Sequence, residues 1–212
     1  AGISSWKFRK DSLCKIINNH DFDLVCMQEV LANQLEDIEQ ATGYAFVGIR
    51  GLYNPIFYKA ERFELLHNEM FWLSETMAPF SKGWDGKYDR YCTWAKFRDR
   101  KSGRIFYVFN THLDHKGREA QRNGLVLIVK KIQEMNKEGY PMILTGDFNV
   151  TPADEVLNDL NNMMTSARET AVKTDKGDTF NGWGRSKGVI DHIYYSGFNA
   201  CTLFEVIRKP YD

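Results

Sequence analysis

The sequence lacks any excess of charge of one sign. Lysine and arginine together number 28, aspartate and glutamate together also number 28, and the formal net charge is zero. A protein that binds duplex nucleic acid through its overall charge normally carries a basic surplus. The balance argues against that mode of binding but leaves room for a local basic groove. Nucleic acid is therefore an open partner that the net charge does not indicate.

Long apolar runs, clustered cysteines and internal repeats are also absent. No stretch approaches the roughly 18–20 apolar residues of a membrane-spanning helix. The four cysteines, Cys14, Cys26, Cys92 and Cys201, form no C-x-x-C pair, which argues against a zinc knuckle or a thioredoxin motif. They are too few for a disulfide scaffold and are expected to be buried thiols. The sequence does not indicate the compartment, because a processed exported protein and a cytoplasmic one both fit. It does not indicate the oligomeric state either.

The composition that remains is that of an ordinary globular protein. Hydrophobic residues make up 43% and aromatic residues 14% of the 212 residues, enough for a sizeable core and unlike a disordered chain. Domains usually contain about 100–200 residues. We therefore expect residues 1–212 to form a single domain.

Hydrophobic periodicity predicts helices and strands in alternation, followed by hairpins. Leu125, Ile128, Ile132 and Met135, for example, recur at helical steps of three and four. The predicted helices are residues 6–20, 33–41, 118–138 and a short one starting near residue 152; the predicted strands are residues 23–28, 44–49, 55–58, 63–73, 93–98, 104–110, 142–145, 189–195 and 202–207. Alternation followed by hairpins favours an α/β sandwich over a purely parallel sheet.

Four polar clusters stand at the ends of predicted strands, where α/β proteins commonly build their sites. They are Gln28-Glu29, Asn110-Thr-His112-Leu-Asp114-His115, Gly146-Asp147-Phe148-Asn149 and Ile190-Asp191-His192. Asp147 and Asn149 are two residues apart, so in extended backbone both side chains point to one face. Glu29, Asp147, Asn149 and Asp191 supply hard oxygen ligands. The clusters therefore predict a Mg²⁺ or Mn²⁺ site that holds a phosphate and orients an attacking water.

Each cluster also has a plainer structural interpretation. Glu29 taken alone is typical of a helix-capping carboxylate, and residues 146–149 taken alone are typical of a turn with local backbone acceptors. Asp191 could pair with Arg185 or Lys187, and His192 is expected to be structural. These interpretations explain the clusters one at a time and not their joint occurrence.

The run His112-Leu-Asp114-His115 also permits a zinc hydrolase of the metallo-β-lactamase type as a lesser alternative. That signature needs another histidine two residues before the first, where this chain has Asn110. It also needs further histidines downstream, and only His192 follows. A zinc site built here would be short of nitrogen ligands.

Together the four clusters resemble the endonuclease/exonuclease/phosphatase superfamily of metal-dependent phosphoesterases. The matching stretches, in the same order and spacing, are Leu24-Val-Cys-Met-Gln-Glu29, Phe109-Asn-Thr-His-Leu-Asp114, Leu144-Thr-Gly-Asp-Phe-Asn149 and Gly188-Val-Ile-Asp-His-Ile-Tyr-Tyr195. The resemblance implies a deoxyribonuclease-like four-layer α/β/β/α sandwich and a divalent metal, usually Mg²⁺. It implies hydrolysis of a phosphate ester by a phosphodiesterase, a nuclease or a phosphatase.

The resemblance also implies roles for individual residues. Glu29 is expected to bind metal, with Asp147 and Asn149 as further ligands or as the groups that hold the attacking water. His112 is expected to contact the phosphate, and Asp191 to belong to the catalytic cluster. The candidates for substrate binding are Asn110, Asp114, His115, Arg118, Arg122, Trp84, Asn181 and Trp183. Trp84, Asn181 and Trp183 are candidates because they lie in Gly-containing loops, residues 76–90 and 175–187, that could control specificity.

Two family segments have no counterpart in this sequence. Relatives begin with a strand that carries an asparagine and end with an S-D-H segment that carries a histidine central to catalysis; His192 is not that histidine. We therefore expect the phosphoesterase domain of residues 1–212 to be incomplete at both ends. This difference keeps open the alternative of a non-catalytic binding domain on the same fold.

Overall fold

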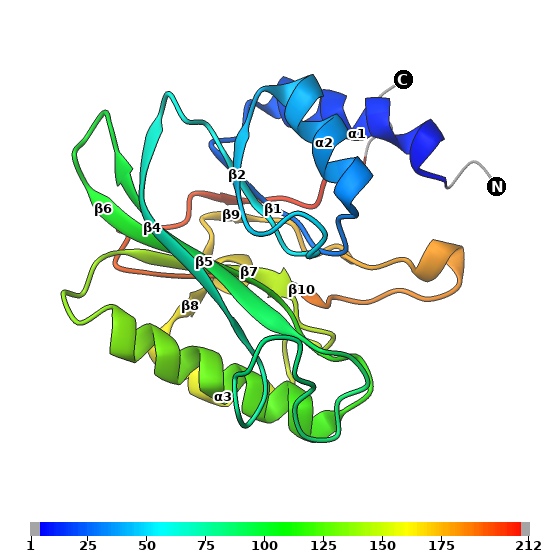
Figure 1. The fold of residues 1–212 in the computed structure, drawn as a ribbon, viewed down its shortest axis with the longest axis vertical. Coiled ribbons are helices and arrows are strands. Elements are labelled where there is room, and N and C mark those ends of the chain that lie inside the picture. Colours follow the sequence, from blue (N-terminus) through cyan, green and yellow to red (C-terminus); the bar gives the residue numbers. More distant parts are fainter. Residues whose placement is uncertain (1–4, 209–212) are drawn as a thin grey trace.

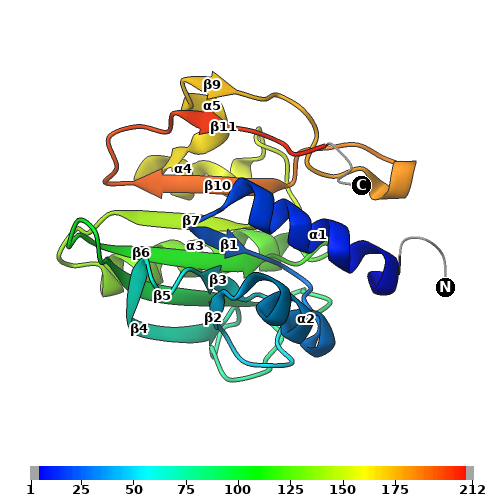
Figure 2. The same ribbon diagram turned by 90° about the horizontal axis from the view of Figure 1, so that it is seen from above.

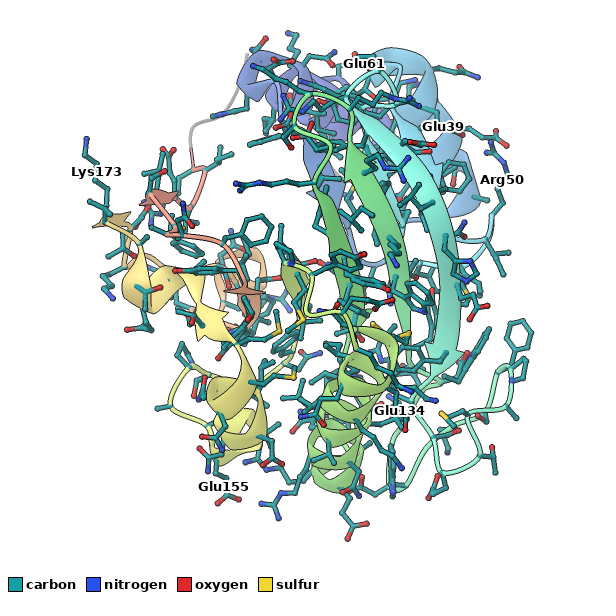
Figure 3. The ribbon with its side chains drawn as sticks, turned by 90° about the vertical axis from the view of Figure 1, so that its left-hand side faces the viewer. Glu39, Arg50, Glu61, Glu134, Glu155 and Lys173 are labelled. Atoms are coloured by element: carbon teal, nitrogen blue, oxygen red, sulfur yellow. The ribbon has the colours of Figure 1, made fainter. Side chains whose placement is uncertain are left out.

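The computed structural model describes residues 5–208 and contains two stacked β-sheets with helices on both outer faces (Figure 1). Helices α1 (Trp6–His20) and α2 (Ala32–Thr42) lie on one side, and α3 (Arg118–Met135) lies on the other. Figure 3 shows the same separation, with Glu39 and Arg50 on the side of α2 and Glu134 on α3. The predicted α/β/β/α sandwich is confirmed.

The first sheet is small and the second is large. Strands β1 (Leu24–Cys26), β3 (Ile56–Tyr58) and β2 (Ala45–Val47) form an antiparallel sheet in that order. The second sheet has the order β4-β5-β6-β7-β10-β8, and its strands are β4 (Phe63–Trp72), β5 (Tyr91–Asp99), β6 (Ile105–His112), β7 (Met142–Asp147), β10 (Asp191–Ser196) and β8 (Thr165–Ser166). Strands β6 and β7 are its parallel pair, joined by the crossover helix α3.

The remaining elements lie beyond β7. They are a 3₁₀ turn η1 (Glu155–Leu157), α4 (Asn158–Met163), α5 (Ala167–Thr170), a second turn η2 (Gly182–Gly184), and the two-stranded parallel pair β9 (Lys173–Thr174) and β11 (Leu203–Phe204). Figure 2 shows these segments stacked on the β10 side of the large sheet. Of the strand predicted at residues 202–207, only Leu203 and Phe204 lie in a strand, β11. The helix predicted to start near residue 152 is replaced by the 3₁₀ turn η1, which begins three residues later.

Three apolar clusters fill the three spaces between the four layers. Helices α1 and α2 bury Ile17 and Leu35 against Phe57 of the small sheet. The two sheets pack on each other through Val47, Ile56, Tyr58, Phe97, Phe106 and Val108. Helix α3 packs on the large sheet through Leu125, Ile128, Ile132, Trp94, Phe109 and Leu144. Alternate residues of β5 and β6 face opposite layers, as the two-residue period of a strand requires. Within residues 5–208 no helix is both long and apolar enough to cross a membrane.

One buried amide ties the two sheets together at the end where the polar clusters meet. Asn110 of β6 is fully buried, and its Nδ2 donates to the carbonyl oxygens of Met27 at 2.8 Å and Pro55 at 3.1 Å. Its Oδ1 accepts from Gln28 Nε2 at 2.7 Å and from Thr145 Oγ1 at 3.2 Å. Asn110 was predicted to bind substrate, but burial and four internal hydrogen bonds make it a structural link.

Replacing Asn110 tests this link. We expect Asn110→Ala to lower the free energy of unfolding by about 3 kcal/mol, because it leaves several buried polar groups without partners. Chemical denaturation checks this value, with Asn162→Ala at an exposed position of α4 as the control. A loss below about 1 kcal/mol would show that the sheets do not depend on the amide.

Candidate active site

Glu29 reaches the site from the small sheet. Its backbone has φ of 60°, a left-handed conformation that is unusual for a residue with a long side chain. The neighbouring amides fix this turn, since Met27 N donates to Pro55 O at 3.1 Å and Val30 N to Tyr53 O at 3.0 Å. The side chain is 76% exposed and its Oε1 lies 3.9 Å from His112 Nδ1. Glu29 therefore presents a free carboxylate to the ends of β6 and β7 and does not cap a helix.

His112 and Asp147 are the last residues of adjacent parallel strands. They lie opposite each other in the β6–β7 register, with His112 Nε2 3.5 Å from Asp147 Oδ2. His112 is buried, and its Nδ1 has no hydrogen-bond partner among the described residues. Burial first, and then the positive charge of Arg90, lower the pKa of His112 to about 3. The imidazole is therefore neutral at physiological pH and keeps one N–H to donate.

Asp191 brings a second carboxylate beside Asp147. The two are partners in the β7–β10 register. Burial, followed by repulsion from Asp191, raises the pKa of Asp147 to about 7, and burial likewise raises the pKa of Asp191. Thr179, whose hydroxyl accepts from Asp191 N at 3.1 Å, also hydrogen-bonds the Asp191 carboxylate. Within the described chain Asp191 forms no ion pair with Arg185 or Lys187.

Asn149 completes the group from the turn after β7. Its φ of 54° is left-handed, which asparagine tolerates better than most residues. Asn149 N donates to Asp147 Oδ1 at 3.0 Å and Asn149 Nδ2 donates to Leu113 O at 2.9 Å. The turn thus fixes both side chains, while Phe148 between them is fully buried in the core as the alternation predicted.

The donor set suits a magnesium-type ion better than zinc. Between residues 5 and 208 no three His, Cys, Asp or Glu side chains come together as a preformed metal cage. Mg²⁺ keeps several waters and needs only one or two carboxylates. Glu29, Asp147 and Asp191 form no ion pair with a described lysine or arginine, so the site carries negative charge that a divalent cation would compensate. Asp114 of the alternative zinc motif is unsuited to bind metal, because its carboxylate is buried and accepts four backbone N–H groups.

The other candidates for substrate binding divide by position. His115 is exposed next to the site. Arg118 and Arg122 are ion-paired with Asp154 and Glu155 at the N-terminal end of α3. Figure 3 shows Glu155 at the periphery of the molecule, so these pairs belong to its outer surface.

Three candidates lie on loops. Trp84 is half-buried in the loop before β5, where its backbone N–H donates to the Glu75 carboxylate at 3.1 Å. Asn181 belongs to the loop that leads into η2 and accepts there from Gly184 N at 2.7 Å. The side chain of Trp183 lies outside the described part of the chain. His192, expected to be structural, is buried with its ring nitrogen 2.8 Å from Val150 O.

Arg90 is a site residue that the sequence analysis missed. It precedes β5, and its charge lowers the pKa of both His112 and Asp147. Its Nε is buried without a hydrogen-bond partner among the described residues. The sequence gives no signal for it, because Arg90 lies about 20 residues before His112, at the end of a loop of irregular sequence.

The sequence matches the endonuclease/exonuclease/phosphatase family over residues 1–212. The chain belongs to this family. A family protein from Bacteroides vulgatus has a similar structure, with a TM-score of 0.87 and 36% identity over 92% of this chain and 81% of that one. A mannosyl-6-phosphatase from Bacteroides thetaiotaomicron has a TM-score of 0.84 and 31% identity over 91% of this chain and 76% of that one.

A curated relative carries a different activity in its name. The CCR4-Not complex 3'-5'-exoribonuclease subunit Ccr4 of Aspergillus oryzae is 30% identical over 143 residues, which are 51% of this chain and 18% of the relative. The match thus spans less than a fifth of that protein. The family assignment overturns the metallo-β-lactamase alternative.

The raised pKa of Asp147 predicts a pH-dependent stability of the metal-free protein. The folded-state pKa of about 7 lies above the ordinary aspartate value, so the stabilisation is present below about pH 4 and is lost as the pH rises through 7. We expect the midpoint of chemical denaturation to decrease as the pH is raised from 5 to 8. Asp147→Asn should make this decrease smaller. If the wild type and Asp147→Asn showed the same pH dependence of stability, the raised pKa of Asp147 would be wrong.

Proposed function

We propose that this chain carries the active site of a divalent-metal-dependent hydrolase, in which water attacks the phosphorus of a phosphate ester. The convergence of Glu29 with His112, Asp147 and Asp191 at one edge of two sheets carries the proposal. Three carboxylates without a basic ion-pair partner in the described chain support a site that receives a cation.

Glu29 would hold the metal ion, with Asp147 and Asn149 as further oxygen donors. When bound, the ion supplies a Lewis acid that offsets negative charge on the phosphate. Asp147 is also placed to accept a proton from the attacking water, because its carboxylate lies 3.5 Å from the ring of His112, the residue that would contact the phosphate. Asn149 would orient that water, since two hydrogen bonds already fix its side chain and backbone.

His112 and Arg90 would receive the phosphate. The neutral imidazole of His112 can donate its N–H to a phosphate oxygen as charge develops there. Arg90 adds a permanent positive charge within electrostatic reach of the same point. His112 and Arg90 would therefore bind the phosphate, while Asp147 and Asn149 would act on the attacking water.

A small phosphorylated compound, such as a sugar phosphate, is the substrate class that we propose. The zero net charge gives no general attraction to nucleic acid. The mannosyl-6-phosphatase is 31% identical over 91% of this chain, whereas the exoribonuclease reaches 30% identity over only 51% of it. Hydrolysis of a short single-stranded nucleic acid is the competing outcome.

The roles are tested by replacing Glu29→Gln, Asp147→Asn and His112→Ala in the full-length protein. We expect each to lower Mg²⁺-dependent turnover of a sugar phosphate by about 100-fold or more, since each removes a group that acts on the transition state. Asp99→Asn is a matched control, because it removes a half-buried turn carboxylate at the opposite end of β5, away from the site.

Calorimetric titration with Mg²⁺ separates an enzyme from a non-catalytic binding domain. An enzyme predicts saturable binding that Glu29→Gln weakens by at least tenfold. Absence of Mg²⁺ binding, together with unchanged turnover in all three variants, would overturn the proposed function.

A further inference from the structure

A closed loop forms one wall beside the candidate site. Residues 74–89 leave the large sheet after β4 and return at Arg90, where Leu73 N donates to Arg90 O at 2.7 Å. Met77, Phe80 and Trp84 in this loop have positive φ values of 53°, 62° and 48°. Such conformations persist only where surrounding contacts determine them.

Two carboxylates lock this loop to the segment that follows His112. Asp114 accepts Lys87 N at 2.8 Å and Tyr88 N at 3.0 Å from the loop. The same carboxylate accepts Lys116 N and Gly117 N, both at 2.8 Å. Burial would raise its pKa, but the four backbone donors outweigh burial and lower the pKa of Asp114 to about 2. Asp114 is thus a permanently charged link between two segments of the site wall.

Asp85 makes the reciprocal connection from the loop to α3. Its Oδ1 accepts Ala120 N at 2.8 Å, in the first turn of the helix. The segments approach so closely that a Cβ on Gly117 would lie 2.5 Å from Asp85 Oδ1. A Cβ on Gly86 would lie 3.2 Å from the Ala120 Cβ. The wall is therefore fixed by packing as well as by hydrogen bonds.

These hydrogen bonds hold the Tyr88 ring in contact with three side chains, His115, Arg90 and Lys87, and Lys87 Nζ lies 5.2 Å from the ring centroid. The rings of Tyr88 and His115 stack at 5.5 Å between centroids with an interplanar angle of 27°. The Arg90 guanidinium carbon lies 5.5 Å from the Tyr88 centroid. Tyr88 and His115 are exposed, while Arg90 is half-buried and its charge reaches His112 and Asp147. The stack restricts where the guanidinium of Arg90 can point.

We propose that Asp114 and Tyr88 are positioning residues, which hold Arg90 in place to bind the phosphate group of the substrate. Asp114 fixes the backbone of Tyr88, and the Tyr88 ring fixes the guanidinium by a cation–π contact. The proposal rests on the proposed function to the extent that the site takes a phosphate group. It assigns to Asp114 an indirect role in place of the direct contact with substrate predicted from the sequence.

Binding of inorganic phosphate tests the proposal independently of turnover. Calorimetry in the presence of Mg²⁺ compares wild type with Tyr88→Phe, Tyr88→Leu, Arg90→Ala, Asp114→Asn and the double variant Tyr88→Leu/Arg90→Ala in the full-length protein. Thermal unfolding confirms that each variant folds. Asp99→Asn is the control for Asp114→Asn, because both carboxylates accept backbone N–H groups in tight turns.

We expect Arg90→Ala to weaken phosphate binding by about tenfold or more and Tyr88→Leu by about fivefold. Tyr88→Phe keeps the ring and should bind as wild type does. The double variant should lose no more than Arg90→Ala, because Tyr88 acts through Arg90. With a sugar phosphate, Tyr88→Leu and a folded Asp114→Asn should raise KM by a larger factor than they lower kcat.

If the loss of phosphate affinity in the double variant equalled the product of the two single-variant losses, the proposal would be overturned, since Tyr88 would then act independently of Arg90. Equal losses in Tyr88→Phe and Tyr88→Leu would overturn it as well, as would a wild type that binds no phosphate. Phosphate binding that follows the expected pattern in a protein without turnover would instead contradict the proposed function and leave the positioning role intact.

Discussion

The site depends on the buried amide that joins the two sheets. Asn110 holds the end of β1 to β6 through the carbonyl of Met27 and the side chain of Gln28. Glu29 is the next residue and lies in the turn that follows β1 of the small sheet, whereas His112 and Asp147 end strands of the large one. Because the proposed chemistry combines groups from both sheets, it requires their relative position to be fixed to a fraction of an ångström. A buried, fully bonded amide provides that precision where apolar packing alone allows sliding.

The same edge of the molecule concentrates negative charge that the protein does not neutralise. Asp147 and Asp191 lie side by side, both are shielded from water, and both have raised pKa values. Such an arrangement costs free energy in the metal-free protein. A bound divalent cation would offset this unfavourable free energy. The same pair of carboxylates would therefore account for metal binding, the pH dependence of stability and the proposed chemistry. The loop before β5 supplies one positive charge near these carboxylates, that of Arg90, whose guanidinium carbon lies 5.5 Å from the centroid of the Tyr88 ring.

Much of the layer arrangement could be predicted from the sequence, because long periodic segments determine it. The helix at residues 6–20 and the strand at residues 63–73 match α1 and β4 closely, since both are long segments. Two-residue strands such as β8 and β9 could not be predicted, because they are too short to show a period. Their pairing is decided by distant neighbours.

The candidate site shows the same division. Glu29, His112, Asp147, Asn149 and Asp191 stand in recognisable motifs, and the structure brings them together. Arg90 could not be predicted, because it reaches the site only through the closure of a 16-residue loop. Asp114 and Asn110 were assigned to substrate because polarity at a strand end indicates a site. Their burial shows that such residues can equally build the frame that holds it.

The central claim is that water attacks phosphorus at this site. Hydrolysis of a sugar phosphate by the full-length protein in water enriched in oxygen-18, with Mg²⁺ present, tests it most directly. Attack at phosphorus predicts that the heavy isotope appears in the released phosphate, as detected by mass spectrometry, and that chelation of the metal abolishes the release. Heavy isotope in the released alcohol, or release that persists without the metal, would contradict the claim.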